Sequence, residues 1–333
     1  MIKYVLILCS ATFLLATSCK EKEVNNKPLV ENLDSLLNIY PDSVELLIKH
    51  GHSMIKEFNY EKALADGALA FRLDSTNLEA RSLYAEILNN KPDRTVDDIS
   101  AAQKHYKVIV RKQPKNTKAL IGLAATYSQQ QDFETSFKYI NEALRIDPKY
   151  RDAYVLKGSN YRWLGNIELT KSSYETAVQQ DPEFYEAYVM LGSLYQAENN
   201  KICIQYYTTA LQLKPKEMDA LYALAYAQNQ FNDFKSAKTL YRQMAQDTSE
   251  YFSSRGLFHQ AYIFQYNEKN IDSAIYFYKS ALVTNPKYVE AWHNLGECYE
   301  TKGEKLTALS SYSKALKYNP DFELSRKAAD RLR

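Results

Sequence analysis

The sequence predicts an all-α protein, an α-solenoid of about eight helical hairpins with short capping helices. Prolines recur at a spacing close to 34 residues, as at Pro114, Pro148, Pro182 and Pro215. Large and small apolar residues recur at helical spacing between these prolines. Glycines fall either at one position within the helices or in the turns. A repeat of this length indicates supersecondary units that bury their apolar faces by stacking.

The clearest copy of the repeat extends from Val289 to Phe322. Its pattern predicts two helices of about a dozen residues, separated by a turn at Lys302 and Gly303. The copy resembles the tetratricopeptide repeat (TPR) at eight positions, namely Trp292, Leu295, Gly296, Tyr299, Ala308, Tyr312, Ala315 and Pro320. The resemblance implies that the hairpins form a right-handed superhelix whose concave side is lined by the first helix of each hairpin.

The repeats are expected to occupy residues 29–333. A helix over Val30 to Tyr40 would cap the front and residues 323–333 the back, because the ends of a solenoid need a polar outer face. The second repeat carries an insertion, Asn89 to Asp98, which should lengthen its turn. The expected starts of the eight repeats are near Val44, Asn77, Thr117, Arg151, Tyr185, Met218, Ser254 and Val289.

The first 18 residues have the pattern of a secretory signal peptide, with Lys3 before an apolar run that ends at Ala16. The ending LLATSC resembles the lipobox of bacterial lipoproteins, although Ala16 stands where that family most often has Leu. The resemblance implies that Cys19 is acylated and becomes the first residue of the mature chain. Residues 19–28 are polar and would form a flexible tether. The alternative is a plain cleaved signal with an incidental cysteine.

A lipid-modified Cys19 would anchor the protein stably, since two or more acyl chains exceed the weak hold of one. The residue after it is Lys20 rather than the Asp that favours retention in the inner membrane. The resemblance therefore favours secretion across the inner membrane and an outer-membrane location, facing the periplasm or the cell surface.

Composition and motifs argue against several functions. The 42 basic and 40 acidic side chains give a net charge of +2, so no nucleic-acid partner is expected. No phosphate-binding glycine loop, nucleophile elbow or paired metal-binding cysteines occur, and the repeats leave no room for a catalytic domain. We expect no enzymatic activity, cofactor or metal. Cys203 and Cys298 lie three repeats apart and are predicted to be buried thiols.

The first helices carry a stripe of residues that should face the concave groove. The stripe is polar in the early repeats and aromatic in the later ones, and His293 lies at its acidic far end. Aromatic rings suit an extended peptide or a sugar chain, because they bury a large area and have few rotatable bonds that lose freedom on binding. The alternative is that the rings pack within the superhelix. The predicted groove residues are Trp163, Tyr222, Tyr226, Phe258, Tyr262, Tyr266 and His293.

These patterns together favour a non-enzymatic scaffold or adaptor for protein–protein interaction at the bacterial outer membrane. Its partner would be an envelope protein or an extended peptide, bound in the aromatic groove. One alternative is a glycan- or peptidoglycan-binding module that uses the same groove. Another is an accessory subunit of an envelope enzyme or of a secretion complex.

Overall fold

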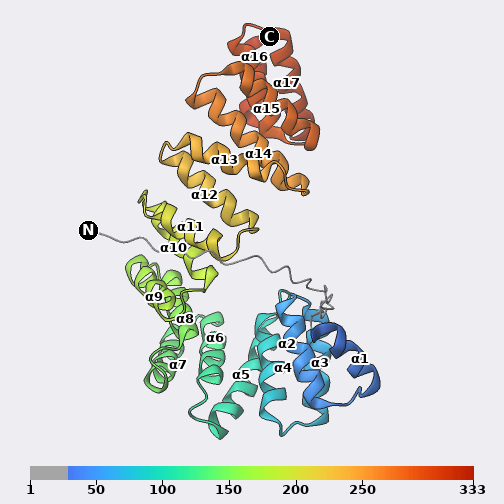
Figure 1. The fold of residues 1–333 in the computed structure, drawn as a ribbon, viewed down its shortest axis with the longest axis vertical. Helices are drawn as coiled ribbons and strands as arrows, with labels where there is room; N and C mark the ends of the chain where they lie inside the picture. The colour runs from blue at the N-terminus through green and yellow to red at the C-terminus, as the bar shows by residue number, and fades with distance from the viewer. Residues whose placement is uncertain (1–28) are drawn as a thin grey trace, which may run out of the picture. The chain divides into compact units, whose positions relative to one another are not determined.

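The computed structural model describes residues 29–333, and every regular element in this part of the chain is a helix (Figure 1). The signal peptide, Cys19 and the tether, all predicted within residues 1–28, lie outside the described residues. The chain divides into two compact units with a boundary after Thr95. Between residues 29 and 333, no helix combines the length and the apolar character that crossing a membrane requires.

Unit 1 is built around one hairpin, formed by its second and third helices. This hairpin packs against the first and the fourth helix, and Leu47, Met54 and Leu83 are buried in the shared core. Gly51 allows the close packing, because a Cβ atom there would lie 2.8 Å from a methyl carbon of Leu83. The described helices of unit 1 are α1 (Leu29–Ile39), α2 (Val44–Lys56), α3 (Tyr60–Leu73) and α4 (Leu78–Asn90).

Unit 2 contains six hairpins between a leading and a closing helix. The leading helix is α5 (Val96–Lys112), and the closing helix is α18 (Glu323–Leu332). The hairpins are α6 (Thr117–Gln129) with α7 (Phe133–Ile146), α8 (Arg151–Trp163) with α9 (Ile167–Gln180), α10 (Tyr185–Ala197) with α11 (Cys203–Leu213), α12 (Met218–Gln230) with α13 (Phe234–Met244), α14 (Glu250–Tyr262) with α15 (Ile271–Thr284), and α16 (Val289–Thr301) with α17 (Lys305–Tyr318). A π-helix, η1 (Ile263–Asn267), follows α14 directly.

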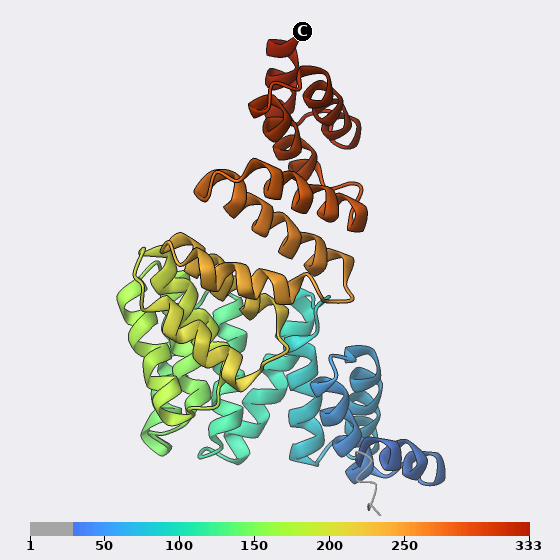
Figure 2. The same cartoon turned by 45° about the horizontal axis from the view of Figure 1, so that its top comes forward.

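Successive helices of unit 2 pack against one another, as Figure 2 shows for α12 to α15. First helices of neighbouring hairpins also approach each other, α6 with α8 and α10 with α12. This packing confirms the predicted all-α solenoid of stacked hairpins. Tyrosines contribute to this core, since Tyr241, Tyr278 and Tyr312 are completely buried.

The hairpin turns share one chemistry. A residue with positive φ ends the first helix, and an Asn or Asp that follows it often caps the second helix. At one turn, Gln131 has a φ of 62° and the Asp132 side chain accepts a hydrogen bond from the Thr135 N–H at 3.1 Å. Glycine holds the positive-φ position at two turns, as Gly165 and Gly303. At the others the residue is Phe58, Gln131, Asn199, Asn232 or Lys269.

The structure and the expected repeat boundaries differ at two places. The seventh first helix, α14, begins at Glu250 rather than near Ser254, because residues 250–253 are also helical. The insertion, Asn89 to Asp98, contains the last residues of α4 and the first residues of α5. The unit boundary falls inside this insertion, so the two helices expected as the second hairpin belong to different units.

Candidate binding surface

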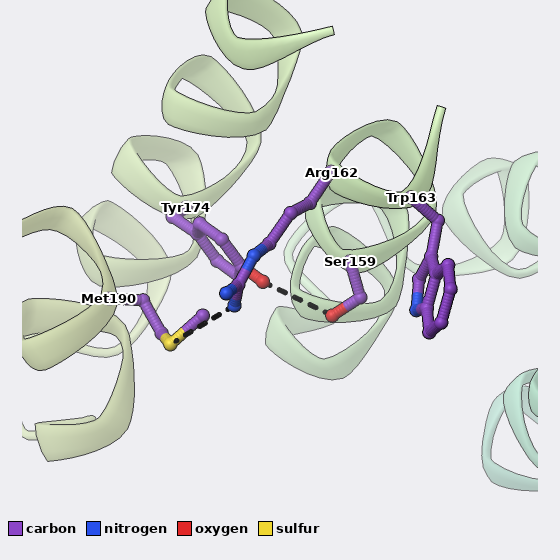
Figure 3. A pocket seen from close by; sticks show the side chains of 5 residues that line it. All are labelled: Ser159, Arg162, Trp163, Tyr174 and Met190. Carbon is purple, nitrogen blue, oxygen red and sulfur yellow. Dashed lines mark hydrogen bonds between the residues drawn. The ribbon is translucent and has the colours of Figure 1, made fainter. Parts of the chain in front are cut away.

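Three cavities of unit 2 lie on the first helices of its hairpins. The first, here named the α8 cavity, has a volume of about 490 Å³ and is lined by residues of α8, α9 and α10. The Trp163 side chain, 76% exposed, lies on one side of Ser159, and Arg162 and Tyr174 lie on the other (Figure 3). The hydroxyl oxygens of Ser159 and Tyr174 are 3.1 Å apart, and Nη1 of Arg162 is 3.9 Å from Sδ of Met190. This cavity therefore combines a cation with an exposed indole.

The second, the α12–α14 cavity, has a volume of about 330 Å³. No side chain that lines it carries a formal charge at neutral pH, because burial and the nearby Arg255 lower the pKa of His259 to about 4. The cavity is lined by Tyr226, Asn229 and Gln230 of α12 and by Phe258, His259 and Tyr262 of α14.

An aromatic cluster behind this cavity fixes the orientation of His259. Its ring stacks on Tyr241 with a centroid distance of 4.9 Å, and its Nε2 lies 3.2 Å from the Tyr222 hydroxyl oxygen. The Arg255 guanidinium lies 4.4 Å from the centroid of the Tyr222 ring, a cation–π contact. Tyr222 therefore supports the cavity from behind and does not line it.

The π-helix η1 separates the second cavity from the third. Tyr262, at the end of α14, packs against Tyr266 of η1 with a centroid distance of 4.5 Å. The buried Gln265 side chain accepts a hydrogen bond from the Tyr278 hydroxyl at 2.7 Å and donates one to Glu297 at 3.1 Å. Short π-helical turns occur frequently at functional sites. This π-helix was not expected from the helical periodicity of the sequence.

The third, the α16 cavity, has a volume of about 410 Å³ and carries charge. Arg331 of α18 forms an ion pair with Glu300 at 2.6 Å, and the Tyr266 hydroxyl donates a hydrogen bond to Glu297. Burial raises the pKa of Glu297, but hydrogen bonds from His293, Tyr266 and Gln265 outweigh it, so the pKa lies below its usual value. The lining residues are Gln265, Tyr266, Glu297, Glu300, Thr301 and Arg331.

Five of the seven predicted groove residues line the three cavities, whereas Tyr222 and His293 line none of them. Trp163 lines the first, Tyr226, Phe258 and Tyr262 line the second, and Tyr266 lines the third. Sequence reasoning did not select the polar residues that complete these cavities, Arg162, Asn229, Gln230, His259 and Arg331, because polar residues on a helix surface carry no distinguishing pattern.

His293 does not take the groove position expected from the sequence. It is buried, with Nδ1 3.0 Å from the Ser325 hydroxyl oxygen of α18 and Nε2 3.4 Å from a carboxylate oxygen of Glu297. The closing helix covers it, which a repeat pattern cannot show. Cys203 and Cys298 are buried free thiols, as predicted. Within residues 29–333, no three His, Cys, Asp or Glu side chains are grouped as metal ligands would be.

The stacked hairpins define a helical repeat solenoid, and comparison with known proteins names the repeat. Tetratricopeptide repeat models match residues 117–150, 152–184 and 289–322. These segments contain the hairpins α6–α7, α8–α9 and α16–α17. The chain therefore contains TPR repeats, a fold that generally serves as a scaffold for protein–protein interaction. None of the three matched segments includes α12 to α15.

Two curated proteins show local sequence similarity. Superkiller protein 3 of Schizosaccharomyces pombe is 26% identical over 119 residues, which cover 34% of this chain and 9% of that protein. The chloroplastic tetratricopeptide repeat domain-containing protein PYG7 of Arabidopsis thaliana is 31% identical over 88 residues, 26% of this chain and 27% of that protein. The similarity thus spans about a quarter or less of either relative.

Solved structures share the fold. The Cut9 and Hcn1 hetero-tetramer of the APC/C matches with a TM-score of 0.50 and 15% identity, over 92% of this chain and 60% of the other. A monomeric mutant of IFIT1 with m7Gppp-AAAA matches with a TM-score of 0.53 and 16% identity, over 86% of this chain and 76% of the other. At such low identity the likeness concerns the fold alone.

Proposed function

We propose that this protein is an outer-membrane scaffold, anchored by a lipid on Cys19, that holds a partner protein against the first helices of unit 2. The observation that carries the proposal is the exposure of aromatic rings on those helices and on η1, which follows α14 directly. Trp163 is 76% exposed, Tyr226 45% and Tyr266 36%. Such rings are typical anchors of protein interfaces, because they bury a large area at a small cost in conformational entropy.

The spacing of these rings favours an extended segment of the partner. The rings come from α8, α12, α14 and η1, which are distributed over several hairpins. A compact ligand in one cavity would leave the others empty, whereas an extended chain can contact first helices in succession. The exposed faces also differ in charge, since Arg162 lies at one cavity and two glutamates lie at another.

In-cell crosslinking followed by capture of the full chain tests the surface. Trp163→Ala combined with Tyr266→Ala should abolish capture of a defined envelope protein, since both rings line cavities. The matched control combines Tyr276→Ala and Val283→Ala, which lie on the second helix α15 and are 66% and 83% exposed. Circular dichroism confirms that both variants are folded. Equal capture by the two variants would contradict the proposed surface.

The anchor is tested separately by Cys19→Ser. The variant carries a signal peptide that is cleaved without acylation, so that its mature chain has neither the lipid nor the apolar signal. We expect the variant to move from the membrane fraction to the soluble periplasmic fraction, because no described helix could hold it in a bilayer. A variant that remains in the membrane fraction would show that another anchor exists.

A second candidate function, glycan binding, is favoured by one specific observation. The α12–α14 cavity combines aromatic rings with amide side chains and has no charged side chain in its lining. Neither of the other two cavities has this composition.

A further inference from the structure

The α12–α14 cavity has the size of a small ligand pocket. Its volume of about 330 Å³ is at the small end of ligand pockets, which hold about 300–1,000 Å³. Phe258 is 9% exposed, whereas Tyr226 and Tyr262 are 45% and 38% exposed. The cavity therefore offers aromatic faces from two different helices, and two of its rings are open to a ligand.

One buried polar atom of the lining has no hydrogen-bond partner among residues 29–333. It is Oδ1 of Asn229. The hydroxyl of Tyr241 also has none, but its ring is fully buried against His259 and does not line the cavity. Native proteins rarely keep an unsatisfied buried polar group without a reason. The Asn229 oxygen therefore indicates a ligand that supplies a hydrogen bond.

The lining also indicates that this ligand is uncharged. A charged ligand would leave water for a cavity that offers no opposite charge, which is unfavourable. Arg255 is near, but it packs over the rings of Tyr222 and Tyr251, at 4.4 and 5.0 Å from their centroids, and it does not line the cavity. The α8 and α16 cavities, with Arg162 and with Glu297, are the places where charge can be paired.

A phenylalanine side chain of a peptide would satisfy only the rings, because it carries no hydrogen-bond donor. A pyranose ring satisfies both requirements, because its C–H faces are apolar and its hydroxyls donate and accept hydrogen bonds. We infer that the α12–α14 cavity binds one uncharged pyranose ring, which packs on Tyr226 and Tyr262 and donates a hydrogen bond to Asn229. This inference rests on the second candidate function and specifies its ligand.

Uncharged pyranose rings have two sources in a bacterial envelope, the N-acetylated sugars of peptidoglycan and neutral polysaccharides. The probes are therefore the tetramer of N-acetylglucosamine and maltotetraose, each titrated by calorimetry into the full chain in mild detergent. A blocked tripeptide with a central phenylalanine serves as the third probe. Saturable binding of either sugar supports the inference, and the sugar that binds identifies the source.

The variants locate the binding. Tyr226→Ala combined with Tyr262→Ala should weaken sugar binding about tenfold or more, because the two rings supply the apolar faces on which the sugar packs. Tyr226→Phe combined with Tyr262→Phe keeps the rings and should retain most of the affinity. Asn229→Ala should weaken binding about threefold or more through the lost acceptor. Tyr276→Ala, on α15, is the matched exposed tyrosine and should leave the affinity unchanged.

Three outcomes would overturn the inference. One is the absence of saturable binding of both sugars to the folded wild-type chain. Another is sugar binding that persists in the double alanine variant. The third is binding of the tripeptide alone, lost in that variant, which would assign the cavity to a protein ligand. None of these outcomes decides the scaffold proposal, because that proposal is tested by the capture of a partner protein in the variant of Trp163 and Tyr266.

Discussion

In two neighbouring hairpins, α14–α15 and α16–α17, a glycine of the first helix allows close packing, but the atoms that approach the glycine differ. In α16–α17 the close approach is between a glycine and a ring, since a Cβ atom at Gly296 would lie 2.5 Å from Cε1 of Tyr312. In α14 the glycine packs on the backbone of the preceding hairpin, since a Cβ atom at Gly256 would lie 2.5 Å from the Tyr241 carbonyl oxygen. Helix α14 also continues into η1 before α15 begins, whereas helix α16 ends in a turn at Gly303.

The difference shows where this protein departs from the regular geometry of its repeat. The hairpin α16–α17 matches a TPR model over residues 289–322. The element α14–η1 instead places Tyr262 at one cavity and Tyr266 at another. Departures from local sequence rules are expected at functional sites, because regular packing alone would not produce them.

The largest expected effect comes from adding one methyl group to α14. Gly256→Ala should lower the free energy of unfolding by about 3 kcal/mol, because the clash is with backbone atoms at 2.5 and 2.7 Å and the helices must separate. Relative to the wild-type chain, the rate of amide hydrogen exchange should increase more in α13 and α14 than in α2 and α3. Repeat stability is determined mainly by neighbouring units, so the effect should decrease with distance along the chain.

Matched glycines provide the scale for this effect. Gly296→Ala should cost about 2 kcal/mol, since the buried Tyr312 ring can shift only slightly. Gly158→Ala should cost less than about 1 kcal/mol, because the nearest atom of Tyr174 would lie 3.1 Å away. If all three variants unfold at the same denaturant concentration, the distinction between backbone and side-chain contacts is wrong.

Acid should destabilise the α12–α14 region next most strongly. His259 has a pKa of about 4 in the folded chain and an unperturbed value of 6.5, so the unfolded chain binds the proton more readily. The stabilisation is therefore complete above about pH 6.5 and is lost as the pH falls toward 4. At pH 5 the loss amounts to about 2 kcal/mol, measured by urea unfolding at a series of pH values.

The pH slope, rather than the absolute stability, is the readout for this prediction. His259→Gln should remove most of the slope between pH 6.5 and 5, even if the variant is less stable at all pH values. His293→Gln, in the neighbouring hairpin, changes another buried histidine and serves as the control. A slope that survives in His259→Gln would assign the acid sensitivity to other groups.

The smallest expected effects concern the turns of the two hairpins. Lys269 has a φ of 55°, and Gly303 has a φ of 78° at the corresponding turn. Lys269→Gly should raise the free energy of unfolding by about 0.5 kcal/mol, because relief of the left-handed strain exceeds the added entropy of the unfolded chain. Gly303→Ala should lower it by about 1 kcal/mol. Thermal unfolding measures both, and shifts of the same sign would contradict this account of the turns.

Much of the fold could be predicted from the sequence, because its signals are local. The residue before a proline is disfavoured in the helical conformation, so prolines at a fixed spacing indicate where second helices end. Six of the eight expected repeat starts coincide with the first residue of a helix. The exceptions begin one residue late at Leu78 and four residues early at Glu250, the second in the repeat that carries the π-helix.

The candidate site could be predicted only in part. Helical periodicity placed Trp163, Tyr226 and Tyr262 on first helices, and each lines a cavity. Periodicity could not show that His293 is covered by α18, because this contact joins residues 32 positions apart. Nor could it show that Oδ1 of Asn229 has no hydrogen-bond partner within residues 29–333, since that depends on the side chains of neighbouring helices.

The sequence by itself determined the hairpins, their approximate boundaries and the aromatic character of the first helices, because each depends on residues a few positions apart. The tertiary structure decided which rings stay exposed, where a π-helix interrupts the pattern and which cavity lacks charge. These properties depend on contacts between hairpins. A repeated pattern fixes how each hairpin forms but leaves open which of its surface groups find a partner in the next.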